Sequence, residues 1–224
     1  MALLSLLRAA DVRLGLGLRF TAVHVDYGLR GPDSDRDREI VERACAEAGV
    51  PVHVERLLGS IAGADFQSRA RAQRYGLARE VAERRGCDVV VTAHNRDDQA
   101  ETVLYRLVKY ASPRGLAGMR PRDGDLARPL LCVGAAELRE YCRAAGIEYG
   151  EDVTNSDPVY ARNVLRLEVL PRLERLNPRV AETLAAAADQ AAAEAEVLKG
   201  TAAEARRRVE LPVAPGDRAA VSVP

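Results

Sequence analysis

The densest group of chemically active side chains lies between Thr92 and Thr102, in the segment TAHNRDDQAET. An apolar run ends here, and His94, Asp97 and Asp98 follow it at once. One aspartate in the first turn of a helix satisfies free backbone N–H groups and suits the helix dipole. A second carboxylate and a histidine exceed what helix capping requires. Because Mg²⁺ prefers carboxylate oxygens, we predict that Asp97 and Asp98 hold the Mg²⁺ of a bound nucleotide.

Two earlier segments carry polar groups that also have ordinary structural explanations. Residues 22–31, AVHVDYGLRG, read as a strand followed by a glycine turn. Residues 67–75, QSRARAQRY, read as the solvated face of a helix. In that helix, Arg71, Arg74 and Tyr75 could instead contact phosphate and a base. Taken alone, the first segment indicates no more than a strand and a turn, and the second is a weak signal for binding.

The last polar segment is DVTNSDPVYARNVLR, at residues 152–166. A polar turn leads into a helix that carries Arg162 and Arg166. The pattern is typical of a capped amphipathic helix, yet it is unusually polar for one. Both interpretations, a structural helix and a phosphate-binding helix, stay open at this point.

Strands and helices alternate along the chain and must position these segments. Strands are predicted at residues 20–26, 50–57 and 88–92, and helices at 1–10, 34–48, 67–85, 97–110 and 134–145. This order predicts an α/β fold in which the three strands share one parallel sheet with helices on both faces. Ligands bind at the carboxyl ends of strands in such sheets. By that rule, we expect the ligand site at residues 26–30 and 93–98.

The C-terminal part of the chain is predicted to be helical. A helix over residues 160–176 stops at Asn177 and Pro178, and residues 180–209 form a long Ala- and Glu-rich helix. Such a helix has too few bulky apolar residues for a core element. We therefore expect one domain over residues 1–178 and a linker helix with a tail over residues 179–224.

Composition narrows the class of protein without identifying it. The 224 residues are 47% apolar, which is ample for a core, and 33 basic residues balance 33 acidic ones. A balanced charge still permits a local basic patch for nucleic acid. The four cysteines form no CxxC pair, and no leader or membrane-spanning apolar run is visible. These features predict a cytoplasmic protein with reduced thiols.

Seven segments together resemble one family in their order and spacing. They are HVDYGLRG, ARAQRY, TAHNRDDQAETVLYRL, RGLAGM, RPLL, DVTNSDPVYARNVLR and LPRLERLNP. The chain thereby resembles the tRNA(Ile)-lysidine synthetases of the N-type ATP pyrophosphatase (PP-loop) superfamily. The resemblance covers nearly all of residues 1–178, and TAHNRDDQAET followed by RGLAGM is its most discriminating part.

The resemblance implies a ligase that uses ATP and Mg²⁺. Such enzymes adenylate the 2-oxo group of the wobble cytidine in tRNA(Ile) with a CAU anticodon. The ε-amino group of free lysine then displaces AMP and forms lysidine. Phosphorylation turns a poor leaving group into a good one, and Mg²⁺ with basic groups offsets the charge of the departing pyrophosphate.

The resemblance also implies roles for individual residues, which fall into catalytic, ATP-binding, metal-binding and tRNA-binding sets. The catalytic set is His94, Asp97 and Asp98; the ATP-binding set is His24, Val25, His94 and Asp98; the metal set is Asp97 and Asp98; the tRNA-binding set is Arg71, Arg74, Tyr75, Arg162 and Arg166. Asp152 and Asn155 are candidates for binding lysine. A homodimer is left open.

One family feature is missing from the printed sequence. The family opens with an SGGxDS loop that cradles pyrophosphate through backbone N–H groups, and this chain starts within the helix that follows such a loop. We therefore expect residues 1–224 by themselves to bind ATP negligibly, to be poorly soluble and to make no lysidine. The alternatives are a non-catalytic nucleotide- or tRNA-binding module and a tRNA thiolase. Thiolases that act on cytidine carry CxxC pairs for an iron–sulfur cluster.

Overall fold

The computed structural model describes residues 1–27, 31–56, 66–109, 113–150 and 161–209. Contacts within the chain divide it into two compact units. Unit 1 comprises Met1–Arg96 and Pro121–Asp157, and unit 2 comprises Asp97–Arg120 and Pro158–Pro224. Each unit is built from segments that are distant in sequence, so each is described by itself.

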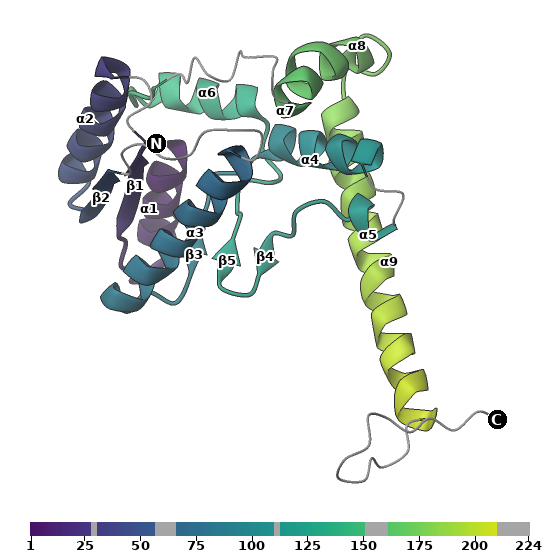
Figure 1. The fold of residues 1–224 in the computed structure, drawn as a ribbon. Helices are drawn as coiled ribbons and strands as arrows, with labels where there is room; N and C mark the ends of the chain where they lie inside the picture. The colour runs from purple at the N-terminus through teal and green to yellow at the C-terminus, as the bar shows by residue number, and fades with distance from the viewer. Residues whose placement is uncertain (28–30, 57–65, 110–112, 151–160, 210–224) are drawn as a thin grey trace. The chain divides into compact units, whose positions relative to one another are not determined.

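Unit 1 contains all the described strands and four helices of more than one turn. Its elements are α1 (Ala2–Leu14), β1 (Ala22–Asp26), α2 (Pro32–Glu47), β2 (Val52–Arg56), α3 (Phe66–Arg85), β3 (Val90–Val91), β4 (Arg122–Asp123), β5 (Leu126–Ala127) and α6 (Ala135–Ala144) (Figure 1). Gly49 and Gly86 follow α2 and α3 with φ of +64° and +62°. Glycine adopts this left-handed backbone without the steric penalty of a side chain, which ends both helices where the sequence predicts.

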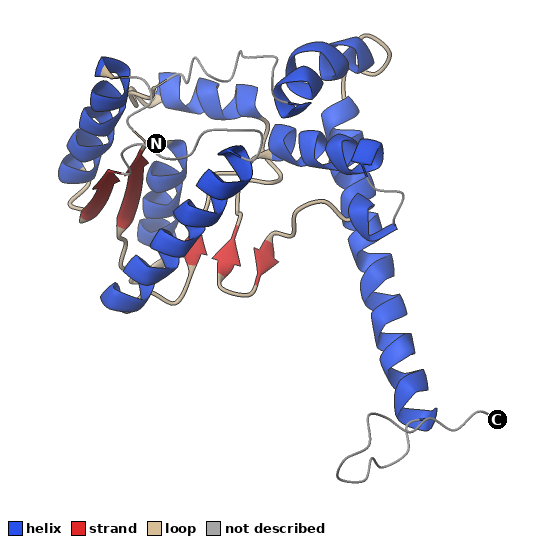
Figure 2. Ribbon diagram, viewed as in Figure 1, coloured by secondary structure: helices blue, strands red, loops and turns tan. Residues whose placement is uncertain are grey.

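The strands confirm the α/β class with parallel pairing, but they do not form one sheet. Among the described residues, β1 pairs with β2 in parallel, and β3 pairs in parallel with β5, whose other edge carries β4 antiparallel (Figure 2). The prediction of a single sheet holding all three strands is therefore wrong. Among the described residues, β3 is two residues long and makes its ladder hydrogen bonds with the 122–127 hairpin rather than with β1 or β2: Val90 N–H donates to Asp125 O and Thr92 N–H to Ala127 O.

Helices cover the strands of unit 1 and connect the two sheets. Helix α2 packs on β1 and β2, while α3 contacts both β1 and β3. Helix α1 contacts α6, where the hydroxyls of Ser5 and Tyr141 lie 2.8 Å apart. Ile40 and Cys45 of α2 and Val81 of α3 are buried in the core. This packing holds the ends of β1 and β3, where two of the polar segments begin.

The described regular elements of unit 2 are all helices. It contains α4 (Arg96–Lys109) apart from its first residue, α5 (Pro113–Leu116), α7 (Ala161–Val164), the π-helix η2 (Leu165–Val169), α8 (Leu170–Glu174) and α9 (Val180–Val209). The single helix predicted over residues 160–176 is thus three consecutive segments with a wider turn in the middle. Helix α9 begins and ends at the predicted residues and contacts α5 and α8.

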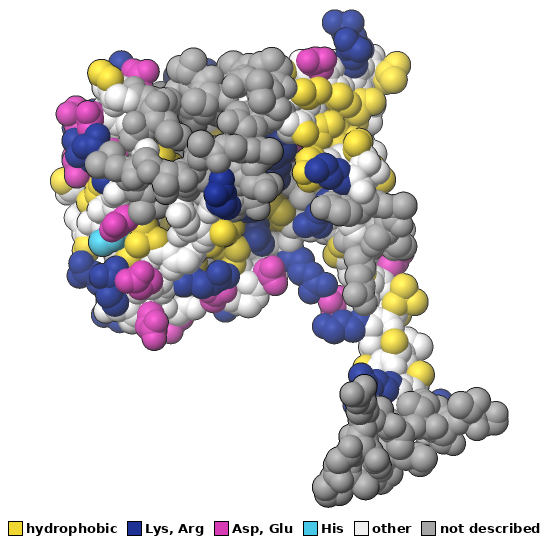
Figure 3. All heavy atoms as spheres, viewed as in Figure 1, with side chains coloured by type: hydrophobic (Ala, Val, Ile, Leu, Met, Phe, Trp, Pro, Cys, Tyr) yellow, Lys and Arg dark blue, Asp and Glu magenta, His cyan; other side chains and the backbone are white. Residues whose placement is uncertain are grey.

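The surface of α9 changes along its length. Ala188 is completely buried, whereas Val197 and Leu198 are exposed, and hydrophobic side chains are visible on the lower part of the helix (Figure 3). Within the described part of the chain, no helix combines the length and apolar composition needed to cross a membrane.

Candidate functional site

The predicted site residues are distributed over both units. Unit 1 holds His24, Val25, Arg71, Arg74, Tyr75 and His94, and unit 2 holds Asp97, Asp98, Arg162 and Arg166. The two candidates for binding lysine, Asp152 and Asn155, lie outside the described residues.

The first two turns of α4 carry the acidic part of the site. Asp97 and Asp98 lie in the first turn, where carboxylates suit the positive end of the helix dipole. The next residues along the helix, from Gln99 to Val103, are all buried. Glu101 is among them and is only 2% exposed. A buried carboxylate one turn after Asp98 needs a cationic partner.

That partner is Arg166, which bridges two carboxylates. Its Nε donates to Glu101 Oε1 at 2.5 Å, and its Nη2 lies 3.5 Å from Asp98 Oδ1. The Arg166 side chain is 37% exposed and that of Asp98 is 23% exposed, so the bridge runs from the core to the surface. The acidic motif and the 152–166 segment, which are far apart in sequence, therefore meet in unit 2.

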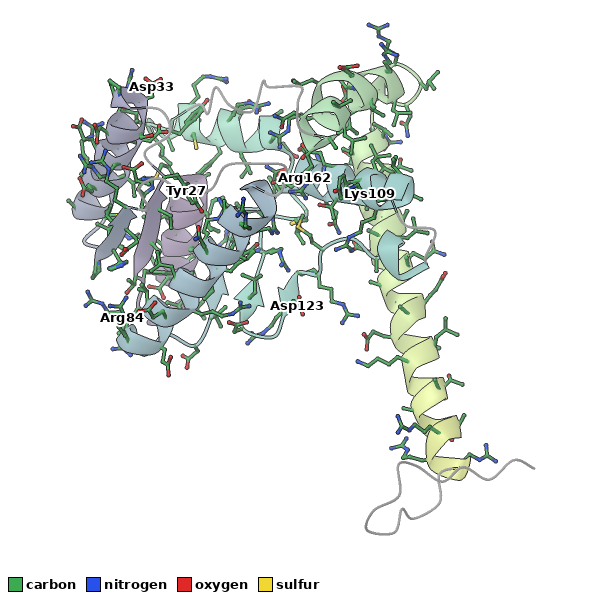
Figure 4. The ribbon with its side chains drawn as sticks, viewed as in Figure 1. Tyr27, Asp33, Arg84, Lys109, Asp123 and Arg162 are labelled. Carbon is green, nitrogen blue, oxygen red and sulfur yellow. The ribbon has the colours of Figure 1, made fainter. Side chains whose placement is uncertain are left out.

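A second arginine reaches the same helix one residue further along. Arg162 Nη2 donates to Thr102 Oγ1 at 2.7 Å, and Thr102 Oγ1 donates to the carbonyl oxygen of Asp98 at 2.8 Å (Arg162 is labelled in Figure 4). Arg162 and Arg166, two of the four arginines predicted to contact tRNA, thus donate hydrogen bonds to α4. This arrangement favours a role in holding the acidic motif for at least part of their donor groups.

In the Glu101–Arg166 pair, burial and the attraction of opposite charges shift the pKa values in opposite directions. Burial raises the pKa of the Glu101 carboxyl, and the hydrogen bond from Arg166 opposes that rise. Burial would lower the pKa of Arg166, but the hydrogen bond and the charge of Glu101, with Asp98 and Asp97, outweigh burial and raise it. Arg166 therefore remains a cation beside the acidic motif.

In unit 1, His94 follows the short strand β3 and is held by a neighbouring hydroxyl. Thr92 Oγ1 and His94 Nδ1 lie 2.8 Å apart. That contact fixes the orientation of the imidazole ring. His24 and Val25 lie within β1 and are half-buried. Burial lowers the pKa of His24, and the charge of Asp26 partly opposes the shift.

Helix α3 places the two arginines predicted to contact tRNA, Arg71 and Arg74, differently. The guanidinium carbon of Arg71 lies 5.1 Å from the ring centroid of Tyr75, a cation–π contact one turn along the helix. Arg74 is exposed. Tyr27, just after β1, donates its hydroxyl to the carbonyl oxygen of Ala70 at 2.7 Å and so ties the end of β1 to α3 (Figure 4).

Three polar residues belong to these arrangements but are absent from the predicted site. Glu101 and Thr102 contact the two arginines, and their signal was their place in the same dense motif as Asp98. Asp26 is buried at the carboxyl end of β1, with its Oδ2 3.3 Å from Nε of Arg56, the residue opposite it in β2. A charged residue at the ligand-binding edge of a parallel sheet was the available signal.

The donor set on α4 fits one kind of metal binding. Among the described residues, no three His, Cys, Asp or Glu side chains converge into a metal cage. Mg²⁺ is commonly held by one or two carboxylates together with substrate phosphates and water. The adjacent carboxylates of Asp97 and Asp98 suit that mode.

Comparison with known proteins gives consistent matches. The family model described as a PP-loop domain matches residues 1–173. A tRNA(Ile)-lysidine synthase of Parabacteroides distasonis is 36% identical over 202 residues, 88% of this chain and 46% of that protein. One from a Bradyrhizobium species is 43% identical over 188 residues, 81% and 52% of the two chains. The chain thus spans about half the length of these curated relatives.

A solved structure shows the same fold. The U34-tRNA thiolase NcsA from Methanococcus maripaludis, with its [4Fe-4S] cluster, superposes with a TM-score of 0.62 over 77% of this chain and 61% of that one. Its sequence is 16% identical, so the likeness concerns the fold alone. The fold and the ordered motifs agree with the match of the family model over residues 1–173, and the chain belongs to the PP-loop domain family.

Proposed function

We propose that this chain carries the nucleotide-activating domain of a tRNA(Ile)-lysidine synthase. The proposed reaction is ATP-dependent attachment of lysine to the wobble cytidine of tRNA(Ile) with a CAU anticodon, with release of AMP and pyrophosphate. The observation that carries the proposal is the contact of Arg166 with both Glu101 and Asp98, which joins the two most polar motifs. Relatives named tRNA(Ile)-lysidine synthase, similar over more than four fifths of the chain, support it.

In this proposal the side chains of the chain bind, orient and balance charge. Asp97 and Asp98 hold Mg²⁺ on the nucleotide phosphates, where the ion offsets the charge of the pyrophosphate. His94, oriented by Thr92, contacts the nucleotide together with His24 and Val25 of β1. The arginines Arg71 and Arg74 with Tyr75 supply cationic and aromatic contacts to tRNA.

The direct test is lysine incorporation. Radiolabelled lysine, ATP and Mg²⁺ are supplied with a tRNA(Ile) transcript carrying the CAU anticodon, and AMP release is measured in parallel. Residues 1–224 are assayed by themselves and with the flanking codons of their reading frame. Lysine-dependent labelling by either form supports the proposal, and labelling by neither form, with ATP and tRNA still bound, assigns the chain to a non-catalytic binding module.

A matched pair of variants links the activity to the site. In the chain extended by its flanking codons, Asp98→Asn should reduce AMP release at least about a hundredfold, because a site for developing charge loses one of its fixed groups. Asp123→Asn, on the exposed strand β4, is the control and should retain full activity (Asp123 is labelled in Figure 4). Equal turnover by both variants would remove Asp98 from the site.

A further inference from the structure

We propose that Arg166 is a positioning residue that holds the carboxylate of Asp98 in one orientation and is itself anchored on the buried Glu101. The inference rests on the proposed function only in giving Asp98 its nucleotide-side role. The positioning itself is a property of unit 2. It assigns to Arg166 a task different from the tRNA contact that the sequence suggests.

The buried carboxylate of Glu101 anchors Arg166. Glu101 is 2% exposed and lies on α4 between Ala100 and Thr102, with Val103 1% exposed beyond them. A carboxylate in such a place has few orientations, because its helix is packed in the core. Its 2.5 Å contact with Nε of Arg166 is a charge-assisted hydrogen bond, the stronger kind. The guanidinium is therefore held at one position beside α4.

The guanidinium of Arg166 is planar and rigid. Its donor nitrogens form a planar fork, so fixing Nε also fixes the direction of Nη2. Nη2 lies 3.5 Å from Asp98 Oδ1, and Asp98 and Glu101 share one face of α4 because they are three residues apart. The Asp98 side chain is 23% exposed, so it extends from the packed face of α4 toward the surface. The contact with Nη2 of Arg166 favours the rotamer that brings Oδ1 toward the guanidinium.

The backbone that carries Arg166 is a wide helical turn. Arg166 lies in the π-helical turn η2, whose first residue, Leu165, and C-cap, Leu170, are buried. The N–H of Leu170 donates to the carbonyl of Leu165, the wide hydrogen bond of a π-turn. Arg162, one turn earlier, binds Thr102. The wide turn thus lies where two arginines reach successive positions on α4, and such turns occur frequently at functional sites.

The experiment separates geometry from charge by a balanced double substitution. Glu101→Gln together with Arg166→Met removes one negative and one positive charge, so the net charge near Asp98 is unchanged. It also avoids leaving a buried charge without its partner. The matched control is Glu168→Gln together with Arg172→Met, the same two replacements at exposed positions of the same segment. Circular dichroism melting verifies that each chain is folded.

The first readout needs no metal. Three-bond couplings in isotope-labelled residues 1–224 report the χ1 rotamer of Asp98. We expect one dominant rotamer in the wild-type chain and in the control, and averaging among staggered rotamers in the double variant. If the double variant does not fold, Arg166→Lys takes its place. Lysine keeps the charge but has a single nitrogen, so it cannot hold both carboxylates in the geometry of the fork.

The second readout is Mn²⁺ binding in the presence of ATP, followed by electron paramagnetic resonance in the chain extended with the codons that flank residues 1–224 in their reading frame. Loss of an orienting partner should weaken binding about tenfold in the double variant and leave the control unchanged. An Asp98 rotamer that stays single in both Arg166 variants overturns the inference. Averaged rotamers, with Mn²⁺ binding that Asp98→Asn does not alter, would uphold the positioning role and refute the metal role in the proposed function.

Discussion

The side-chain amide of Gln99 pairs with the backbone of Met119 as one strand pairs with the next. Nε2 donates to the carbonyl oxygen of Met119 at 2.9 Å, and the N–H of Met119 donates to Oε1 at 2.7 Å. Both residues are buried. The two motifs that discriminate the family best in sequence, TAHNRDDQAET and RGLAGM, are therefore joined by a two-bond clamp within unit 2.

Removing the clamp should destabilise the fold. Gln99→Ala leaves a buried N–H and a buried carbonyl of Met119 without partners, at a cost of about 1–3 kcal/mol for each. Gln73→Ala, on an exposed face of α3, is the control and should change the free energy of unfolding by less than about 0.5 kcal/mol. Urea unfolding of the two variants measures the difference. Equal stabilities would show that the clamp contributes nothing.

Gly118 is expected to be intolerant of any side chain. Its φ is +53°, and a Cβ there would lie 2.6 Å from Nε2 of Gln99. Gly86 has a similar φ of +62° with open space around it. Gly118→Ala should therefore cost more than Gly86→Ala, whose penalty is the left-handed backbone alone, about 1–2 kcal/mol. Adding Gln99→Ala should recover part of the excess, and strict additivity in this cycle would contradict the clash.

Stability should depend on the protonation of His24 below pH 6.5. Burial lowers the pKa of this half-buried imidazole below its ordinary value of 6.5, so the unfolded chain binds the proton more readily than the folded one. Between the two pKa values, the free energy of unfolding falls as the pH falls. The wild-type chain should lose stability more steeply than His24→Asn as the pH drops through this window. Parallel curves from urea unfolding at several pH values would refute the prediction.

The arginines of α3 should differ in their contribution to RNA binding. Arg74→Met should weaken binding of the tRNA(Ile) transcript and lower the slope of log affinity against log salt by about one, as expected for loss of one phosphate contact. Arg84→Met is the control: it lies on the same helix, is exposed, and has Glu80 3.7 Å away (Arg84 is labelled in Figure 4). Filter binding over a series of salt concentrations measures both quantities. A larger effect of Arg84→Met would move the RNA surface along α3.

The elements that sequence predicts well are those with strong local signals. Helix α9 has the predicted bounds because residues 180–209 contain many strong helix formers and no proline. Helices α2 and α3 end before Gly49 and Gly86, whose left-handed backbone is a local property. Such features depend on few neighbours, which a sequence displays directly.

Other elements depend on partners that a sequence does not display. Strand β5 is two residues long and exists because β3 and β4 lie beside it. The turn at Gly124, in the sequence DGD, is a hairpin signal, but the flanking strands are too short for a periodic pattern. The π-turn η2 has no signature that distinguishes it from the helix predicted over residues 160–176.

In the candidate site, too, local features could be predicted from the sequence and long-range contacts could not. The type and position of Asp97, Asp98 and His94 were visible at the end of a predicted strand. Their partners were not, because the contact of Arg166 with Glu101 joins residues that are 65 positions apart. From sequence, Arg162 and Arg166 could be assigned either to a structural helix or to a phosphate-binding helix. The structure adds that both donate to α4, which neither interpretation specified.

The change of environment along α9 has a consequence for amide hydrogen exchange. Near Ala188 the helix is packed, whereas every described side chain from Glu196 to Arg208 is exposed. In the packed part, an amide exchanges only when tertiary contacts open together with the helix. In the exposed part, where the side chains are not packed in the core, opening requires mainly the local breaking of helix hydrogen bonds. One continuous helix should therefore show protection that falls from the level of the folded unit toward that of an isolated peptide.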